Sequence, residues 1–304
     1  MTEKEKVFNM ADSIVKALIN KEVLMIACST KELVMRGNEL HQLFPIGTAV
    51  LGRILSAGAL FGKTLKEKDQ KVTISLNGGG PAGTVMVTAD EQARVKGYVA
   101  NRNVNIAPGE DGVLSVDKAV GTDGFVTVVK DIGLKEPYVG KTKIVTGQIA
   151  EDLAYYMLQS EQQPSIVYLN VWINGALEIL TAGGYLILPL PGASEETLSA
   201  IEQKSLALHN YGIMLLSKTP LQIIEEIFEG QEVQIIEQAV PKYYCECSKA
   251  RMAQALACLG QAEIEDMIEK DGGAEIVCRF CNTKYQFSAE ELREIVRAAS
   301  QREN

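Results

Sequence analysis

The chain has 304 residues, of which 46% are hydrophobic and 23% are charged, a composition typical of soluble globular proteins. At roughly 100 to 200 residues per domain, this length indicates two domains. The net charge of −9 argues against nucleic acid as a partner, because affinity for phosphate backbones comes largely from clustered Lys and Arg. We therefore expect a protein or a small molecule as the partner.

The sequence gives no sign of membrane insertion or export. No apolar run approaches the roughly 18 residues needed to span a bilayer, and residues 1–7 contain no basic stretch leading into an apolar region. We therefore expect a cytoplasmic protein with no membrane partner. In a reducing compartment, the six cysteines indicate metal or redox chemistry more often than structural disulfides.

Residues 1–192 predict a mixed α/β core domain. Helical patterns occupy 11–18 and the stretch from Pro45 to Phe61, and alternating residues on either side of a Gly-rich turn predict a β-hairpin. The predicted strands lie near 23–28, 72–76, 85–88, 94–99, 125–129, 166–173 and 185–190, and a further helix is predicted over 151–160.

Residues 193–240 predict a helical, acidic linker. The segment has eight Glu against two Lys, a net charge of −6. Ser194 can cap a first helix, while Thr219 and Gln222 form a capping box for a second helix that Gly230 ends. Two short helices with apolar stripes are not stable alone, so we expect both to lie on another surface. The second stripe consists of Ile223, Ile224, Ile227 and Phe228.

Four of the six cysteines form two close pairs near the C-terminus. Cys245-x-Cys247 and Cys278-x-x-Cys281 are separated by thirty residues. Each pair supplies two thiolates, and the chain between them can bring the pairs together around a tetrahedral zinc ion. We therefore predict one zinc ion per chain on these four side chains. Residues 241–304 would then form a small zinc-binding domain whose core is marginal without its metal.

Whether such a zinc is permanent or switchable stays open on spacing alone. Four-cysteine sites are typically structural. However, a disulfide across Cys245-x-Cys247 closes a very small ring, so it should be strained and easily reduced, which suits a reversible switch. Nearby basic residues also favour thiolate over thiol. These are Lys242, Lys249, Arg251, Arg279 and Lys284.

Two rival functions fit the cysteine pairs less well. A zinc ribbon could bind nucleic acid, but residues 241–304 carry nine Lys or Arg against eleven Asp or Glu and no basic stripe. A thiol oxidoreductase is the enzymatic alternative. Its Cys-x-x-Cys normally opens a helix, whereas Cys278 and Cys281 are predicted to lie in a hairpin knuckle.

The other cysteines and the histidines suggest no catalytic group. Cys28 follows an apolar run and Cys258 lies near the end of a helical stretch, so both are predicted to be packing residues. His41 and His209 are isolated in the sequence and do not suggest a catalytic base. We therefore expect a protein that is not an enzyme.

Three upstream segments accompany the cysteine pairs. They begin at Gly121-Thr-Asp-Gly-Phe-Val, at Glu151-Asp-Leu-Ala-Tyr-Tyr and at Ala182-Gly-Gly, and the second runs into Ser160-Glu-Gln-x-Pro-Ser. Together with the cysteine pattern, they resemble the 33 kDa chaperonin family, the bacterial heat-shock holdases activated by oxidation. The resemblance spans most of the chain from Leu51 to the final helix.

This resemblance implies an α+β fold with an α/β core, a helical linker lying on it, and a zinc domain. It implies that the four cysteines bind zinc when reduced and form the disulfides Cys245–Cys247 and Cys278–Cys281 when oxidised. It also implies an ATP-independent holdase for unfolded or partly folded client proteins, homodimeric when oxidised. Two positions depart from the family pattern, because Gln148 and Ala250 stand where Glu is expected.

The stabilisation of a small domain by zinc, the composition of the linker and the family resemblance together predict a chaperone activity that oxidation switches on. While zinc is bound, the folded C-terminal domain should keep the linker helices against the core. Oxidation should remove the ligands, unfold this domain, and release the acidic helices so that their apolar faces capture unfolding proteins.

Overall fold

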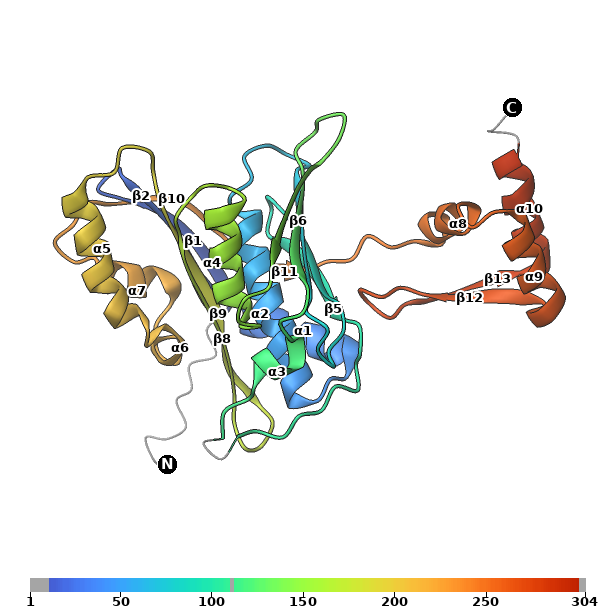
Figure 1. Cartoon of the computed structure of the whole chain (residues 1–304), viewed down its shortest axis with the longest axis horizontal. Coiled ribbons are helices and arrows are strands. Elements are labelled where there is room, and N and C mark those ends of the chain that lie inside the picture. The colour runs from blue at the N-terminus through green and yellow to red at the C-terminus, as the bar shows by residue number, and fades with distance from the viewer. Residues whose placement is uncertain (1–10, 110–111, 301–304) are drawn as a thin grey trace. The chain divides into compact units, whose positions relative to one another are not determined.

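The computed structural model describes residues 11–109 and 112–300. It divides into two compact units, of which the first ends at Tyr244 and the second begins at Cys245 (Figure 1). Both units combine helices with sheets, so the predicted α+β class is confirmed.

The first unit contains a five-stranded antiparallel sheet with the strand order β10-β1-β2-β9-β8. The register of β2 on β9 places Cys28 opposite Gly184, in the middle of the sheet. Its strands are β1 (Ser13–Ile19), β2 (Val23–Ser29), β8 (Ile166–Ile173), β9 (Ile179–Pro189) and β10 (Val233–Ala239).

A second sheet of six strands has the order β11-β5-β4-β3-β6-β7. All its pairs are antiparallel except β11, which runs parallel to β5. The predicted hairpin is the β3–β4 pair. The strands are β3 (Lys71–Asn77), β4 (Val85–Asp90), β5 (Arg94–Val99), β6 (Phe125–Asp131), β7 (Tyr138–Lys143) and β11 (Lys242–Tyr243).

Helix α2 (Pro45–Gly62) lies between the two sheets, contacting β3, β4 and β5 on one side and β2, β8 and β9 on the other (Figure 1). Gly58 makes this close packing possible, since a Cβ there would lie 2.4 Å from a methyl group of Val87. The other helices of this layer are α1 (Lys31–His41), α3 (Val116–Val120) and α4 (Ile149–Gln159).

The sequence prediction that no stretch could span a membrane needs one correction. By length and composition, α2 is long and apolar enough to do so, and it is the one such helix among the residues that the structure describes. However, 89% of this stretch is buried inside the first unit. It is therefore placed as the central core helix of that unit, which explains its apolar composition.

Helices of the predicted linker cover the other face of the five-stranded sheet (Figure 1). As predicted, Ser194 caps the first helix by accepting from the Thr197 N–H at 3.3 Å, and Thr219 forms a capping box with Gln222. The helices are α5 (Glu195–Leu208), α6 (Tyr211–Met214) and α7 (Pro220–Ile227).

We call the packing between these helices and the sheet the linker core. Its buried members from the linker are Ile201, Leu208, Tyr211, Leu215, Ile223, Ile224 and Phe228, which pack against Val15, Ala17, Ile19, Val23, Met25, Ala27, Tyr185 and Ile187 of the sheet. The Tyr211 hydroxyl also donates to the backbone carbonyl of Cys28 at 3.1 Å. The apolar stripes predicted from the sequence therefore do lie on another surface.

The linker is not helical throughout. Its last part forms β10, an edge strand that pairs with β1. The side chain of Lys63 is 5% exposed, and its ammonium lies 2.5 Å from the carboxylate of Glu237 on β10. The same ammonium donates to the backbone carbonyl of Glu91, so Lys63 links β10 to the end of α2 and to the turn after β4.

The predicted helix over 11–18 is wrong, because Ser13–Ile19 is strand β1. This strand pairs on both sides, with β2 and β10, and both of its faces are largely buried. A short strand that is buried on both faces shows no clear alternation, so its apolar run cannot be distinguished from a helix by periodicity.

The C-terminal unit combines a β-hairpin with three helices. Among its described residues, the buried core consists of Leu256, Ile264, Phe287 and Leu292, and partly buried apolar side chains pack around them. A capping box starts the last helix, since Ser288 and Glu291 exchange hydrogen bonds of 2.9 and 3.2 Å. The elements are α8 (Lys249–Ala257), α9 (Gln261–Asp271), β12 (Gly273–Val277), β13 (Lys284–Ser288) and α10 (Ala289–Ser300).

Replacing Gln148 by Glu should stabilise the first unit. Arg53 of α2 donates to the Gln148 side chain at 2.7 Å, forms no salt bridge among the described residues, and has a buried Nε without a hydrogen-bond partner there. A carboxylate at this position would compensate the desolvated cation and add about 1–2 kcal/mol to the free energy of unfolding. Denaturant unfolding checks this, with Gln203→Glu on exposed α5 as the control of equal charge, and no gain over that control would contradict it.

Candidate metal centre

The first cysteine pair precedes helix α8. Cys245 and Cys247 are both half-buried, and Ser248 follows as the N-cap of α8, accepting from the Arg251 N–H at 3.2 Å. The helix start therefore fixes the backbone immediately after Cys247.

The second pair lies in the tight turn between β12 and β13. The Cys278 N–H donates to the Thr283 carbonyl at 3.0 Å, and the Asn282 N–H donates to the Cys278 carbonyl at 2.8 Å. Asn282 has a φ of +59°, a left-handed conformation that Asn tolerates better than most residues. The predicted hairpin knuckle is thus confirmed, and Cys281 does not open a helix.

The fold brings the four thiol groups together. All four sulfurs lie within 4.8 Å of one another. The Sγ atoms of Cys245 and Cys278 are 3.7 Å apart, and those of Cys247 and Cys281 are 3.2 Å apart. We call these four residues the cysteine cluster.

The cysteine cluster fits a tetrahedral metal ion. With metal–sulfur bonds of about 2.3 Å, two sulfurs of such a site lie about 3.8 Å apart, close to the distance between Cys245 and Cys278. A disulfide would need a separation of about 2.05 Å, and all six cysteines are free thiols in this structure. An all-thiolate set suits zinc among the common metals of proteins.

Two hydroxyl groups from the β13 side of the turn contact the cluster. The Tyr285 hydroxyl donates to the sulfur of Cys247 at 3.1 Å, and the Thr283 hydroxyl lies 3.2 Å from the sulfur of Cys281. These contacts give no signal in the amino-acid sequence. Tyr285 has only an alternating strand pattern in the sequence, and nothing local relates it to a cysteine 38 positions away.

The surroundings shift the pKa values of three thiols of the cysteine cluster in different directions. Burial raises the pKa of Cys245 and of Cys278, and hydrogen bonds from backbone N–H groups only partly offset this effect. Burial also raises the pKa of Cys281, but hydrogen bonds from Thr283 and the neighbouring thiols outweigh it and lower that pKa to about 7. The Cys281 thiolate thus forms readily while burial keeps Cys245 and Cys278 protonated, and a bound cation would favour the ionisation of these two thiols.

The basic residues near the cysteines contribute less positive charge than the sequence suggested. Lys249 pairs with Glu291, Arg251 with Glu246, and Lys284 with Glu275, at 2.5, 2.8 and 3.1 Å. Because each of these cations has a carboxylate beside it, the three side chains stabilise thiolates less than unpaired cations would.

The other two cysteines lie outside the cluster. Cys28 is fully buried in the core of the first unit, as predicted, and burial raises the pKa of its thiol. Cys258 is exposed at the end of α8, so the prediction that it packs is wrong. His41 is buried and bonded to the Gly97 carbonyl at 3.1 Å, while His209 bonds its own helix through Ser205.

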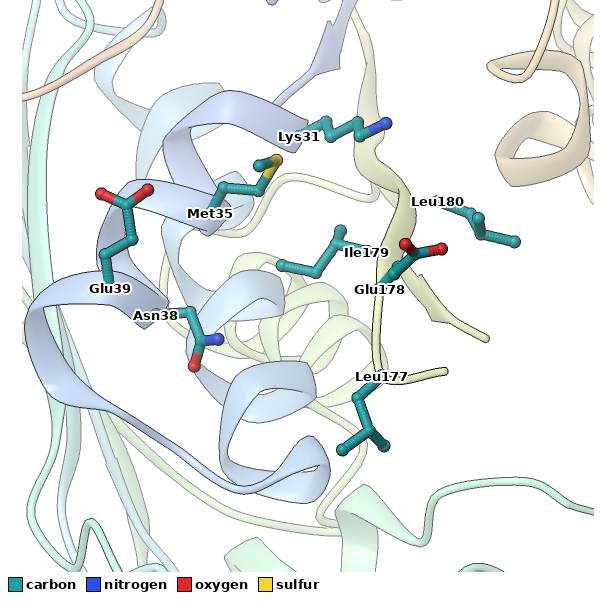
Figure 2. A pocket seen from close by; sticks show the side chains of 8 residues that line it. All are labelled: Lys31, Met35, Asn38, Glu39, Leu177, Glu178, Ile179 and Leu180. Carbon is teal, nitrogen blue, oxygen red and sulfur yellow. The ribbon is translucent and has the colours of Figure 1, made fainter. Parts of the chain in front are cut away.

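The first unit also has a surface hollow of about 470 Å³ beside α1. Figure 2 shows Met35 of α1 and Ile179 of β9 on its two sides. The Glu39 carboxylate at its rim is bonded to Arg36 at 2.9 Å. The hollow therefore offers apolar contact with charged groups at its edge.

Comparisons with known proteins agree on one family. The family described as "Hsp33 protein" matches residues 12–288. The chain belongs to the Hsp33 family. A 33 kDa chaperonin of Caldanaerobacter subterraneus subsp. tengcongensis is 41% identical over 292 residues, covering 95% of this chain and 99% of that protein. One from Lactobacillus johnsonii is 41% identical over 293 residues, covering 96% and 100%.

A solved structure agrees with this assignment. The crystal structure of the 33 kDa chaperonin (heat shock protein 33 homolog) from Thermotoga maritima has a TM-score of 0.85 and 34% identity, covering 96% of this chain and 99% of that one. The resemblance inferred from the sequence is therefore confirmed. As a member of the Hsp33 family, the chain is a chaperone with four cysteines positioned to hold a metal ion.

Proposed function

We propose that this Hsp33-family chain is an ATP-independent holdase that becomes active when its cysteine cluster is oxidised. Cys245, Cys247, Cys278 and Cys281 would bind one zinc ion in the reduced chain. The observation that carries the proposal is the approach of four sulfurs within 4.8 Å, in a unit whose described residues include four buried apolar core side chains besides the cluster. Such a unit depends on its metal for folding.

A bound zinc ion would hold the four thiolates together and screen their negative charges. Hydrogen peroxide can convert each pair of thiolates into a disulfide in two steps. One thiolate attacks the O–O bond and becomes a sulfenic acid as hydroxide leaves. The second thiolate attacks that sulfur, which forms the disulfide and releases another hydroxide. The expected products are Cys245–Cys247 and Cys278–Cys281.

Loss of the thiolates would unfold the C-terminal unit and free one end of the linker, 193–240. The chain leads directly from Cys245 back through β11 and β10 to α7. When β10 and the helices leave the sheet, both sides of the linker core become exposed. This apolar surface can bind unfolding proteins, while the net charge of −6 on the linker limits self-association.

The remaining parts of the proposal follow from this binding mode. The partners are unfolded or partly folded proteins, and the exposed linker core also favours a homodimer of the oxidised chain. The activity needs no catalytic group, so we infer that the protein is not an enzyme. A cytoplasmic location, with no nucleic-acid or membrane partner, agrees with free thiols and an acidic chain.

The test compares the reduced and the peroxide-treated protein. Zinc content is measured with a chromogenic chelator, and suppression of aggregation is measured on a chemically denatured client without ATP. We expect one zinc per reduced chain, its release by peroxide, and chaperone activity only afterwards. Cys28→Ser and Cys258→Ser serve as controls and should switch normally. Full activity of the reduced, zinc-loaded protein would contradict the proposal.

A further inference from the structure

Tyr285 connects the cysteine cluster to the hydrophobic core of the C-terminal unit. Its ring is half-buried and packs against the apolar core side chains Leu256, Ile264, Phe287 and Leu292. Its hydroxyl donates to the Cys247 sulfur at 3.1 Å. One side chain of β13 therefore contacts both the apolar core and a sulfur supplied by the other cysteine pair.

The hydrogen-bond donors are distributed unevenly over the four sulfurs. Cys245 and Cys278 accept from backbone N–H groups within their own pairs, which the cysteine turns supply automatically. Cys247 instead accepts from the side chain of Tyr285. Among the described residues, one other side-chain hydroxyl contacts a sulfur of the cysteine cluster. It belongs to Thr283, which lies beside Cys281.

A hydrogen bond to a thiolate acts in two ways. It stabilises the negative charge of a metal-bound sulfur, and partners of this kind typically change metal affinity 10- to 100-fold when they are removed. It also withdraws electron density from the sulfur lone pair, which makes that sulfur a weaker nucleophile toward an oxidant. A hydroxyl on Cys247 should therefore both tighten metal binding and slow oxidation.

We propose that Tyr285 is a positioning residue of the redox switch, whose hydroxyl holds Cys247 in its metal-binding state and slows its attack on peroxide. The inference rests on the proposed function. In the reduced chain, the hydrogen bond keeps the Cys247 thiolate bound to the metal. Oxidation of Cys247 removes that thiolate acceptor and with it the link between the site and the core of the unit. Tyr285 thus sets how much oxidant the switch requires.

The experiment uses Tyr285→Phe in the full-length chain. The substitution removes the hydroxyl and keeps the ring that packs against the core. Tyr155→Phe, an exposed tyrosine on α4 of the first unit, is the matched control. Three properties are measured: zinc affinity by chelator competition, the rate of zinc release by hydrogen peroxide, and the thiolate-to-metal charge-transfer band of the cobalt(II)-loaded protein.

For Tyr285→Phe we expect zinc affinity to fall roughly 10-fold and peroxide-driven release to become several-fold faster. The cobalt charge-transfer band should shift to lower energy, because a sulfur without its hydrogen bond gives up electron density more easily. A loss of packing alone would not move this band. Tyr155→Phe should match the unaltered protein in all three measurements.

Two outcomes would overturn the inference. Tyr285→Phe could match the unaltered protein in affinity, release rate and cobalt spectrum. Alternatively, the zinc-saturated variant could lose its helical circular dichroism, which would make the ring position and not the hydrogen bond decisive. Failure of the proposed function is distinguishable from both, since the unaltered protein would then bind no zinc or would be active while reduced.

Discussion

Replacing Cys278 by Ser should unfold the C-terminal unit while the first unit stays folded. Cys278 is 6% exposed, and its sulfur lies 3.7 Å from that of Cys245 in the middle of the cluster. A serine hydroxyl does not ionise at neutral pH, so the variant would keep only three thiolate ligands. Metal binding contributes on the order of 10 kcal/mol to folding in small zinc domains. The small core of this unit, centred on Leu256, Ile264, Phe287 and Leu292, cannot replace that contribution.

Hydrogen exchange and zinc content measure this effect. In Cys278→Ser, protection should disappear from residues 245–300 and persist in β2, β9 and α2, with little or no bound zinc. A chelator strong enough to remove the metal from the unaltered protein should give the same pattern. Cys258→Ser is the control, because that exposed thiol lies outside the cluster. Retained protection with full zinc occupancy in Cys278→Ser would show that the cluster does not hold the unit together.

Replacing Ile224 by Glu should produce a chaperone that is active without oxidation. Ile224 of α7 is fully buried in the linker core, between the other linker helices and the five-stranded sheet. Burying a carboxylate there without a partner costs several kcal/mol, comparable with the whole stability expected for short helices on a sheet. The linker should therefore leave the sheet and expose its apolar face, while the cysteine cluster stays reduced.

The readout is aggregation suppression by the reduced variant, with zinc content measured in the same sample. We expect substantial activity at one zinc per chain, because the substitution separates linker release from oxidation. Ile213→Glu on α6 carries the same charge at a side chain that is 57% exposed, so it should remain inactive when reduced. Loss of zinc from Ile224→Glu, or equal activity of the two variants, would contradict the proposal that linker release is the activating step.

Features that depend on local spacing could be predicted from the amino-acid sequence. Two pairs of cysteines, with one and two residues between their members and thirty residues between the pairs, already predict a shared metal site. The capping box at Thr219 was also predicted correctly, because a cap and its N3 partner lie in one turn of chain. The family followed from the same kind of local pattern.

Features that depend on distant partners could not be predicted in this way and became visible in the folded chain. Whether Ser13–Ile19 is a strand depends on β2 and β10, and β10 comes more than 200 residues later in the chain. The Gln148 side chain accepts a hydrogen bond from Arg53, which lies on another helix. The Tyr285 hydroxyl donates to the sulfur of Cys247, which lies 38 positions earlier in the chain. Periodicity describes which face of a segment is apolar. It does not say which distant segment covers that face, because many arrangements bury the same area and only the packed chain selects one.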